Sequence, residues 1–189
     1  MNKELKIDPL LIIEKYYKKG SEIYNMLVDH STQVKNKALE IADKHPELHL
    51  DKQFIAEAAM LHDIGIFMCN APRIHCTGTH EYIEHGYLGA ELLRKEGLFK
   101  HALVSERHTG LGISLEMILK NKLPLPHRDF LPISPEEQVI CYADKFYSKT
   151  RLNETSKLQR IRTDLKKYGE SQVLQFNSWN TLFEGEKSA

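Results

Sequence analysis

Six residues of types that bind divalent metal ions are spread over the middle of the sequence. In chain order they are His30, His62, Asp63, His85, His108 and Asp144. Imidazole nitrogens and carboxylate oxygens without a thiolate suit Fe, Mn, Co, Ni or Zn, and these ligand types do not choose among the metals. The adjacent pair His62-Asp63 is the most informative part, because Asp63 has two carboxylate oxygens and could bind one ion while bridging to a second. The set predicts a metal-dependent hydrolase.

Helical periodicity predicts that most of these side chains face the protein interior. His30, for example, shares a helix face with Leu27 and Met26. The position of His108 is less clear, because His101 lies on the same predicted helix. A single histidine on an apolar face is more often a hydrogen-bonded core residue than a ligand, and the aspartates could instead form structural ion pairs. Five helices that each supply a metal-type side chain nevertheless favour a metal site in a helical bundle.

The elements that position these residues are predicted to be helices, and no segment alternates as a strand does. The predicted ranges are 9–19, 21–45, 51–65, 81–96, 98–109, 114–121, 134–149, 155–168 and 171–184. Ser21 is expected to cap the second helix, Pro46 to follow its end, and Gly65 to adopt a left-handed turn. Residues 66–80 are expected to form a loop. The fold class is an all-α bundle, one domain over residues 1–189 with its metal-binding core at about 21–150.

Composition limits the partners and the compartment. The 189 residues contain 26 Lys+Arg and 26 Asp+Glu, so no basic excess favours nucleic acid. The apolar runs are too short to span a bilayer and the N-terminus lacks a signal-peptide pattern, which predicts a cytoplasmic protein without membrane contact. Three cysteines in an odd count predict reduced thiols, with Cys69 and Cys76 as an alternative zinc pair. The C-terminal amphipathic segment is expected to complete the bundle, and a homodimer contact is the alternative.

The order of these residues resembles a known family. His30, the pair His62-Asp63 and then Asp144 resemble the H…HD…D signature of HD-domain metal-dependent phosphohydrolases, and residues 61–65 are similar to its HDIG variant. The segments 84–90 and 105–110 also look like those of two-metal members. The resemblance covers roughly residues 21–150 and implies a helical bundle. The chain departs from some HDIG proteins, because Ile66 and Phe67 follow the motif in place of a lysine.

The resemblance implies a role for each site residue. His30, His62, Asp63 and Asp144 would bind one divalent ion, and Asp63, His85 and His108 would bind a second, with His80 as the alternative to His85. Asp63 is therefore the expected catalytic residue, shared by both ions. Substrate-binding groups are expected near the ligands in sequence or on the long loop. These candidates are Arg107, Lys145, Lys149, Arg151, Arg73 and His80.

The predicted reaction is hydrolysis of a phosphomonoester or phosphoanhydride by a metal-activated hydroxide at a binuclear site. The expected substrate is a small phosphorylated metabolite, most simply a nucleotide. Dinucleoside tetraphosphate hydrolysis is one alternative, and a non-catalytic nucleotide-binding signalling module is another. A structural helical protein with core histidines is a third, and it would bind no metal.

Overall fold

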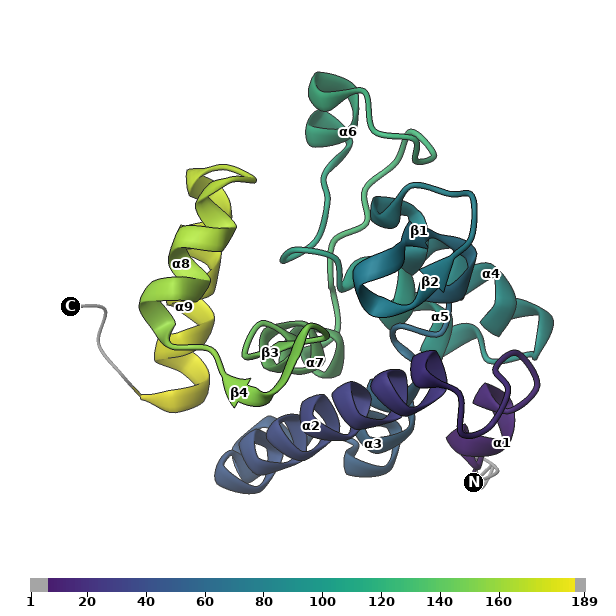
Figure 1. The fold of residues 1–189 in the computed structure, drawn as a ribbon. Helices are drawn as coiled ribbons and strands as arrows, with labels where there is room; N and C mark the ends of the chain where they lie inside the picture. Colours follow the sequence, from purple (N-terminus) through teal and green to yellow (C-terminus); the bar gives the residue numbers. More distant parts are fainter. Residues whose placement is uncertain (1–6, 186–189) are drawn as a thin grey trace.

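The chain is mostly helical in the computed structural model, which describes residues 7–185. Figure 1 shows the arrangement of its helices. Within the described range the α-helices are α1 (Pro9–Ile13), α2 (Glu22–Lys44), α3 (Lys52–Leu61), α4 (His85–Lys95), α5 (Phe99–Arg107), α6 (Leu115–Asn121), α7 (Pro135–Asp144), α8 (Leu158–Lys166) and α9 (Glu170–Glu184). The all-α fold class is confirmed. In the described residues no helix combines the length and apolar character needed to cross a bilayer.

Side-chain caps begin several of these helices where the sequence predicts. Ser21, Asp51 and Ser134 each accept a hydrogen bond from the backbone N–H three residues later. Such a bond satisfies one of the donors that the first helical turn leaves without an intrahelical partner. At the other end of α2, the helix stops at Lys44 and Pro46 begins a short 3-10 turn. Local chemistry therefore sets the ends of the long helix that carries His30.

Two short hairpins correct the expectation of a strand-free chain. Strand β1 (Asn70–Ala71) pairs antiparallel with β2 (Cys76–Thr77) inside the predicted loop, which also contains 3-10 turns at Ile66–Met68 and Pro72–Ile74. Strand β3 (Tyr147–Ser148) pairs antiparallel with β4 (Arg151–Thr155). The predicted helix over 134–149 consequently ends at Asp144, and the chain turns back over residues 147–155 before α8 begins.

The core lies where α2, α3, α5 and α7 pack together, with α4 against α5. Helices α8 and α9 pack on each other, and α9 closes the far side of α7 (Figure 1). The ring of Tyr142 stacks on Phe176 from α9, with centroids 5.3 Å apart, and its hydroxyl donates to Asn180 at 2.8 Å. Within the described residues, the C-terminal helix thus completes the bundle, which leaves the homodimer alternative a prediction.

Gly65 does not adopt the predicted left-handed turn, and a glycine is needed there for another reason. Its φ of −84° is ordinary for any residue. A Cβ at this position would lie 2.3 Å from the carbonyl oxygen of His85 and 2.4 Å from the nitrogen of Gly89. The backbone of α4 therefore approaches residue 65 too closely for a side chain, and this contact fixes His85 relative to the His62-Asp63 pair.

Candidate metal centre

The six metal-type side chains meet in the interior although they come from different elements. His30 lies within α2, whereas the others lie at or next to helix ends. His62 follows the last residue of α3, His108 follows that of α5, and Asp144 is the last residue of α7. Carbonyl groups at helix C-termini carry partial negative charge, so three such ends at one place favour a cation.

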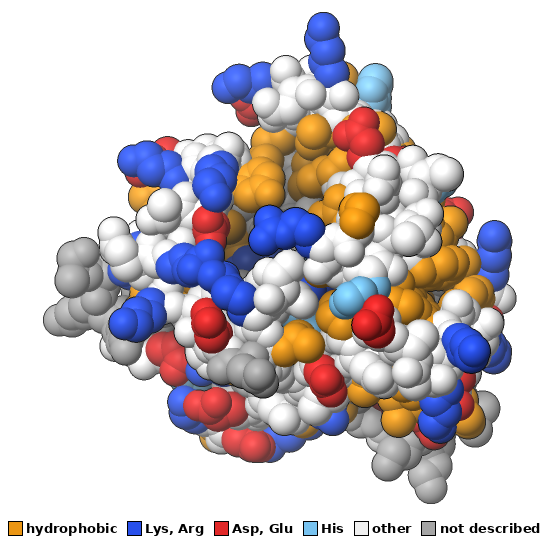
Figure 2. Space-filling model, viewed as in Figure 1, with side chains coloured by type: hydrophobic (Ala, Val, Ile, Leu, Met, Phe, Trp, Pro, Cys, Tyr) orange, Lys and Arg blue, Asp and Glu red, His pale blue; other side chains and the backbone are white. Residues whose placement is uncertain are grey.

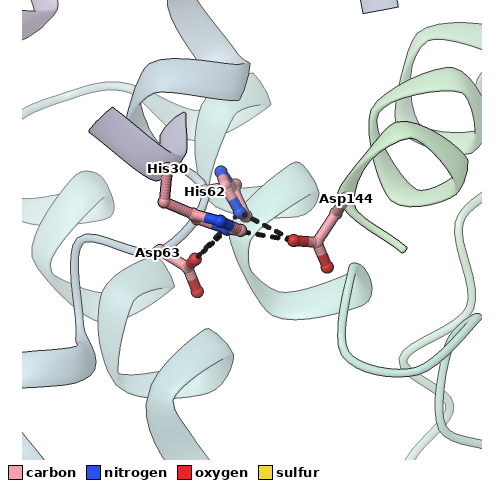
Figure 3. Close-up of side chains that lie close together, drawn as sticks. All are labelled: His30, His62, Asp63 and Asp144. Carbon is pink, nitrogen blue, oxygen red and sulfur yellow. Dashed lines mark ion pairs between the residues drawn. The ribbon is translucent and has the colours of Figure 1, made fainter. Parts of the chain in front are cut away.

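The first group contains His30, His62, Asp63 and Asp144, shown in Figure 3. Nε2 of His30 is 3.1 Å from Asp63 Oδ2 and 3.1 Å from Asp144 Oδ1. Nε2 of His62 is 2.9 Å from Asp63 Oδ2 and 3.6 Å from Asp144 Oδ1. One ligand atom from each side chain therefore points at a common centre, with two nitrogens and two oxygens.

The second group uses the other oxygen of the same carboxylate. Asp63 Oδ1 lies 3.3 Å from Nε2 of His85 and 3.4 Å from Nε2 of His108. The two histidine Nε2 atoms are 3.0 Å apart. Asp63 thus presents Oδ2 to the first group and Oδ1 to the second, so one carboxylate belongs to both groups.

Backbone carbonyls fix the tautomers of three histidines. Nδ1 of His62 lies 2.7 Å from the carbonyl of Ala59, and Nδ1 of His108 lies 2.7 Å from that of Ser105. Nδ1 of His85 lies 2.5 Å from the carbonyl of Tyr82. A carbonyl oxygen only accepts, so each Nδ1 carries a proton, and the neutral form of each ring has its lone pair on Nε2, which faces the centre. Two such lone pairs 3.0 Å apart repel each other unless a cation lies between them.

Burial strengthens this requirement. His30, His62 and Asp63 are fully buried. Both ring nitrogens of His30, Nε2 of His62 and Oδ1 of Asp63 are buried without a hydrogen-bond partner among the described residues, whereas Oδ2 of Asp63 pairs with Lys149. Leaving so many polar atoms unsatisfied is costly, and a metal ion is one partner that would satisfy them together. The donor set fits divalent ions.

Charges around the centre keep most of the ligands in metal-binding form. Burial alone would raise the pKa of Asp63, but His62 and Lys149 hold it well below its usual range. Burial would likewise raise the pKa of Asp144, and Lys145 and the histidines outweigh it. Burial lowers the pKa of His108 to about 4. The pKa of His62 rises to about 9 because the attraction of both carboxylates exceeds the effect of burial, so an incoming ion would displace a proton there.

Two lysines place positive charge beside the carboxylates. Lys149 Nζ is 2.6 Å from Asp63 Oδ2, and Lys145 Nζ is 2.7 Å from Asp144 Oδ2. Lys145 comes directly after α7, and Lys149 comes from the turn between β3 and β4. The hairpin therefore carries an ammonium group back to the metal-type ligands.

A cavity of about 410 Å³ opens next to these groups. Asp144, Lys145 and Lys149 form part of its wall, together with Arg73 and Arg151. In Figure 2 lysine and arginine side chains gather in the middle of the visible face. Four cationic residues line a space that also reaches Asp144, and such a space suits a phosphate group.

Comparison with known proteins identifies the family. The family model of the HD domain matches residues 27–148. The chain belongs to the HD-domain family of metal-dependent phosphohydrolases. The HD domain of this chain brings together the histidine and aspartate side chains described above, and HD domains bind divalent metals.

Three curated relatives match this HD chain over part of their length. An uncharacterized protein of Methanocaldococcus jannaschii is 37% identical over 128 residues, which cover 66% of this chain and 68% of the relative. Two proteins named tRNA (cytidine(56)-2'-O)-methyltransferase, from Picrophilus torridus and Thermoplasma volcanium, are each 32% identical. These matches cover 71% and 81% of this chain but only 35% and 39% of the methyltransferases. No solved structure matches the chain.

Two of the predicted substrate-binding residues lie outside the HD site. Arg107 is the last residue of α5, directly before His108, but its guanidinium forms an ion pair with Glu137 at 3.0 Å and is not part of the cavity wall. His80 lies 3.2 Å from Glu84 with its side chain 43% exposed, and it belongs to neither ligand group. Of the two alternatives, the structure places His85 beside Asp63. His101 points elsewhere and meets Glu57 at 3.3 Å.

Tyr82 contacts the HD site although it was not predicted from the sequence. The ring of Tyr82 stacks on His85 with centroids 4.6 Å apart, and the side chain lines the cavity. Burial raises the pKa of its phenol, which Lys149 partly offsets. The sequence signal for Tyr82 is its position three residues before His85.

The alternative zinc pair lies outside both ligand groups. Cys69 and Cys76 are buried, and burial raises their thiol pKa values to about 12 and about 11, which disfavours the thiolate that zinc binding requires.

Proposed function

We propose that this HD protein hydrolyses a phosphomonoester or phosphoanhydride of a small metabolite at a site that binds two divalent ions. The observation that carries the proposal is the position of Asp63, whose two oxygens face two separate groups of histidines. A second observation supports phosphate as the reacting group, because cationic side chains line the adjacent cavity. The nitrogen and carboxylate ligands suit Fe, Mn, Co, Ni or Zn and do not select one of them.

The residues of the chain have distinct tasks in this proposal. His30, His62 and Asp144 would hold one ion, His85 and His108 the other, and Asp63 both. When bound, such ions act as Lewis acids and lower the pKa of a coordinated water to about 7. The Nδ1–H bonds to backbone carbonyls keep the imidazole rings oriented, so that ligand geometry is set before substrate arrives.

The lysines and arginines of the cavity would bind and orient the phosphate. Lys149 and Lys145 already lie against the carboxylates of the centre, so a phosphate held by their ammonium groups would lie next to both ligand groups. Arg73 and Arg151 line the same cavity and can donate to further phosphate oxygens. Hydrolysis then breaks one P–O bond and adds water across it, with no nucleophilic serine or cysteine required.

A nucleotide is the proposed substrate class, with a dinucleoside tetraphosphate as its larger variant. The Picrophilus and Thermoplasma relatives are named for an activity on tRNA. We therefore include a terminal phosphate of RNA among the substrates to test. Methyl transfer itself is not proposed, since the chain spans little more than a third of those proteins.

The test is metal-dependent phosphate release from protein purified without chelator. Each of Mn, Fe, Co, Ni and Zn is supplied with nucleoside monophosphates, dinucleoside tetraphosphates and end-phosphorylated tRNA. Asp63→Ala should abolish release, whereas Asp43→Ala, which removes an exposed carboxylate paired with Lys52, should leave it unchanged. Full activity of Asp63→Ala would contradict the mechanism. Nucleotide binding without release under any metal would instead support the non-catalytic module.

A further inference from the structure

A second cavity lies between the loop that follows α5, helix α6 and the connection from α8 to α9. Its volume is about 580 Å³, within the range of roughly 300–1,000 Å³ that small-molecule sites occupy. In Figure 1 α6 stands apart from the end of α8, and the space-filling view of the same face is hollowed and lined by apolar side chains between them (Figure 2). Nothing in the ligand groups or the phosphate cavity accounts for this space.

No residue lines both cavities, but residues that are adjacent in sequence or joined by an ion pair line one cavity and the other. Tyr82 lines the phosphate cavity, and its neighbour Ile83 lines the second one. Asp164 lines the phosphate cavity and forms an ion pair at 2.8 Å with Lys167, which lines the second. Thr109, directly after His108, also belongs to the second cavity. A molecule whose phosphate lies at the metal centre could therefore extend into the second cavity without crossing the core.

The lining of the second cavity is apolar at its base and cationic at its edge. Ile83, Met117 and Leu123 pack onto a buried cluster around Ile113, which makes the base firm. Tyr168 lines the cavity with its side chain 52% exposed, and so offers an aromatic ring that is open to solvent. Lysine residues at the edge include Lys120 and Lys166. Flat apolar and aromatic surface next to positive charge suits a planar ring that carries phosphate.

One wall of this cavity is held in place by α9. The side chain of Gln172, itself buried, accepts a hydrogen bond from the backbone N–H of Leu111 at 2.7 Å and donates to the carbonyl of Gly112 at 3.0 Å. Gly110 and Gly112 have positive φ values of 60° and 93°, so the loop follows a path that other residues rarely adopt. The loop is thus shaped and fixed before any ligand enters, as expected of a specificity site.

We infer that the second cavity binds the nucleobase and sugar of the substrate, so that the protein acts on nucleoside phosphates rather than on small aliphatic phosphates. This inference rests on the proposed function for the position of the phosphate. Tyr168 supplies the aromatic face and Met117 the opposing apolar contact, whereas the cations of the first cavity recognise only phosphate.

The test compares nucleoside 5'-monophosphates with ribose 5-phosphate, which keeps the reacting phosphate and the sugar but lacks the base. For the metal-loaded wild-type protein we expect kcat/KM to be at least about tenfold higher for the best nucleotide. Tyr168→Ala and Met117→Ala should raise KM for that nucleotide about tenfold and leave ribose 5-phosphate unchanged. Leu174→Ala, which removes an exposed side chain of α9 that is not part of the cavity wall, is the matched control and should change neither value.

A binding measurement separates this inference from the proposed function. If no compound releases phosphate, the proposed function fails, and free nucleosides are then tested by saturation-transfer NMR against ribose. Nucleoside signals in the wild type that are lost in Tyr168→Ala would support the cavity as a base site even so. Equal turnover of ribose 5-phosphate and nucleotide, or nucleoside binding that Tyr168→Ala leaves intact, would overturn the inference.

Discussion

Replacing Gly65 with alanine should damage the second ligand group while sparing the first. The new Cβ would lie 2.3 Å from the backbone oxygen of His85, whereas ordinary contact begins at 3.4 Å, so α4 must move by about 1 Å. His85 is the first residue of α4, and its Nε2 lies 3.3 Å from Asp63 Oδ1. We expect overpacking to cost about 1–3 kcal/mol, which lowers the melting temperature by about 2–12 °C for a chain of this size.

The assay combines thermal unfolding with metal content per chain. Gly65→Ala should retain about one ion where the wild type retains two. Gly97→Ala is the matched control, because its Cβ meets nothing within 4 Å and its φ of 76° imposes only backbone strain of about 1–2 kcal/mol. The control should therefore lose stability without losing metal. Wild-type melting temperature and metal content in Gly65→Ala would refute the argument that close packing at this residue positions His85.

Three further predictions follow from the same structure. Chelation should lower the melting temperature by about 5–10 °C, since an ion present at a hundredfold excess over its Kd contributes about 2.7 kcal/mol, and an unchanged melting curve would argue for core histidines. Lys149→Met should reduce kcat/KM roughly tenfold to a hundredfold, because its ammonium lies beside Asp63. Arg107→Met should instead lower thermal stability and leave KM unchanged, because the Arg107 guanidinium pairs with the buried Glu137. Burial would raise the pKa of Glu106, but Arg128 and Arg94 lower it. The ionised carboxylate therefore stabilises the folded protein above its unfolded pKa of about 4.3, and this stabilisation is lost as pH falls through the lower folded pKa. Glu106→Gln should flatten the loss of stability in acid measured by denaturant titration, and an unchanged acid profile would count against this ion-pair network.

The sequence was sufficient for the approximate positions of the helices and for the six clustered side chains because those features have local signals, although the first helix ends at Ile13 and not at residue 19. Ser21 and Asp51 cap helices, and the apolar spacing around His30 shows which face is buried. The hairpin over 147–155 had no such signal, since no glycine or proline follows Asp144 to end the helix. Its strands are too short for alternation to be visible, and their position depends on tertiary contacts.

Adjacency in sequence was an unreliable guide to the phosphate-binding residues. Lys145 follows Asp144 where the helix has ended, and it does contact that carboxylate. Arg107 precedes His108 within a helix, where successive side chains diverge by about 100°, so it points to Glu137 instead. The role of Gly65 could not be predicted either, because the close approach of α4 is a property of packing and not of local conformation.

The central claim is that Asp63 bridges two metal ions, and metal content per chain tests it most directly. Elemental analysis would be made on the wild type, His85→Ala and His108→Ala, all purified without chelator. The geometry around the two oxygens of Asp63 predicts about two ions in the wild type and one in each variant. One ion in all three proteins would contradict it, and would return His85 and His108 to the core beside a mononuclear site.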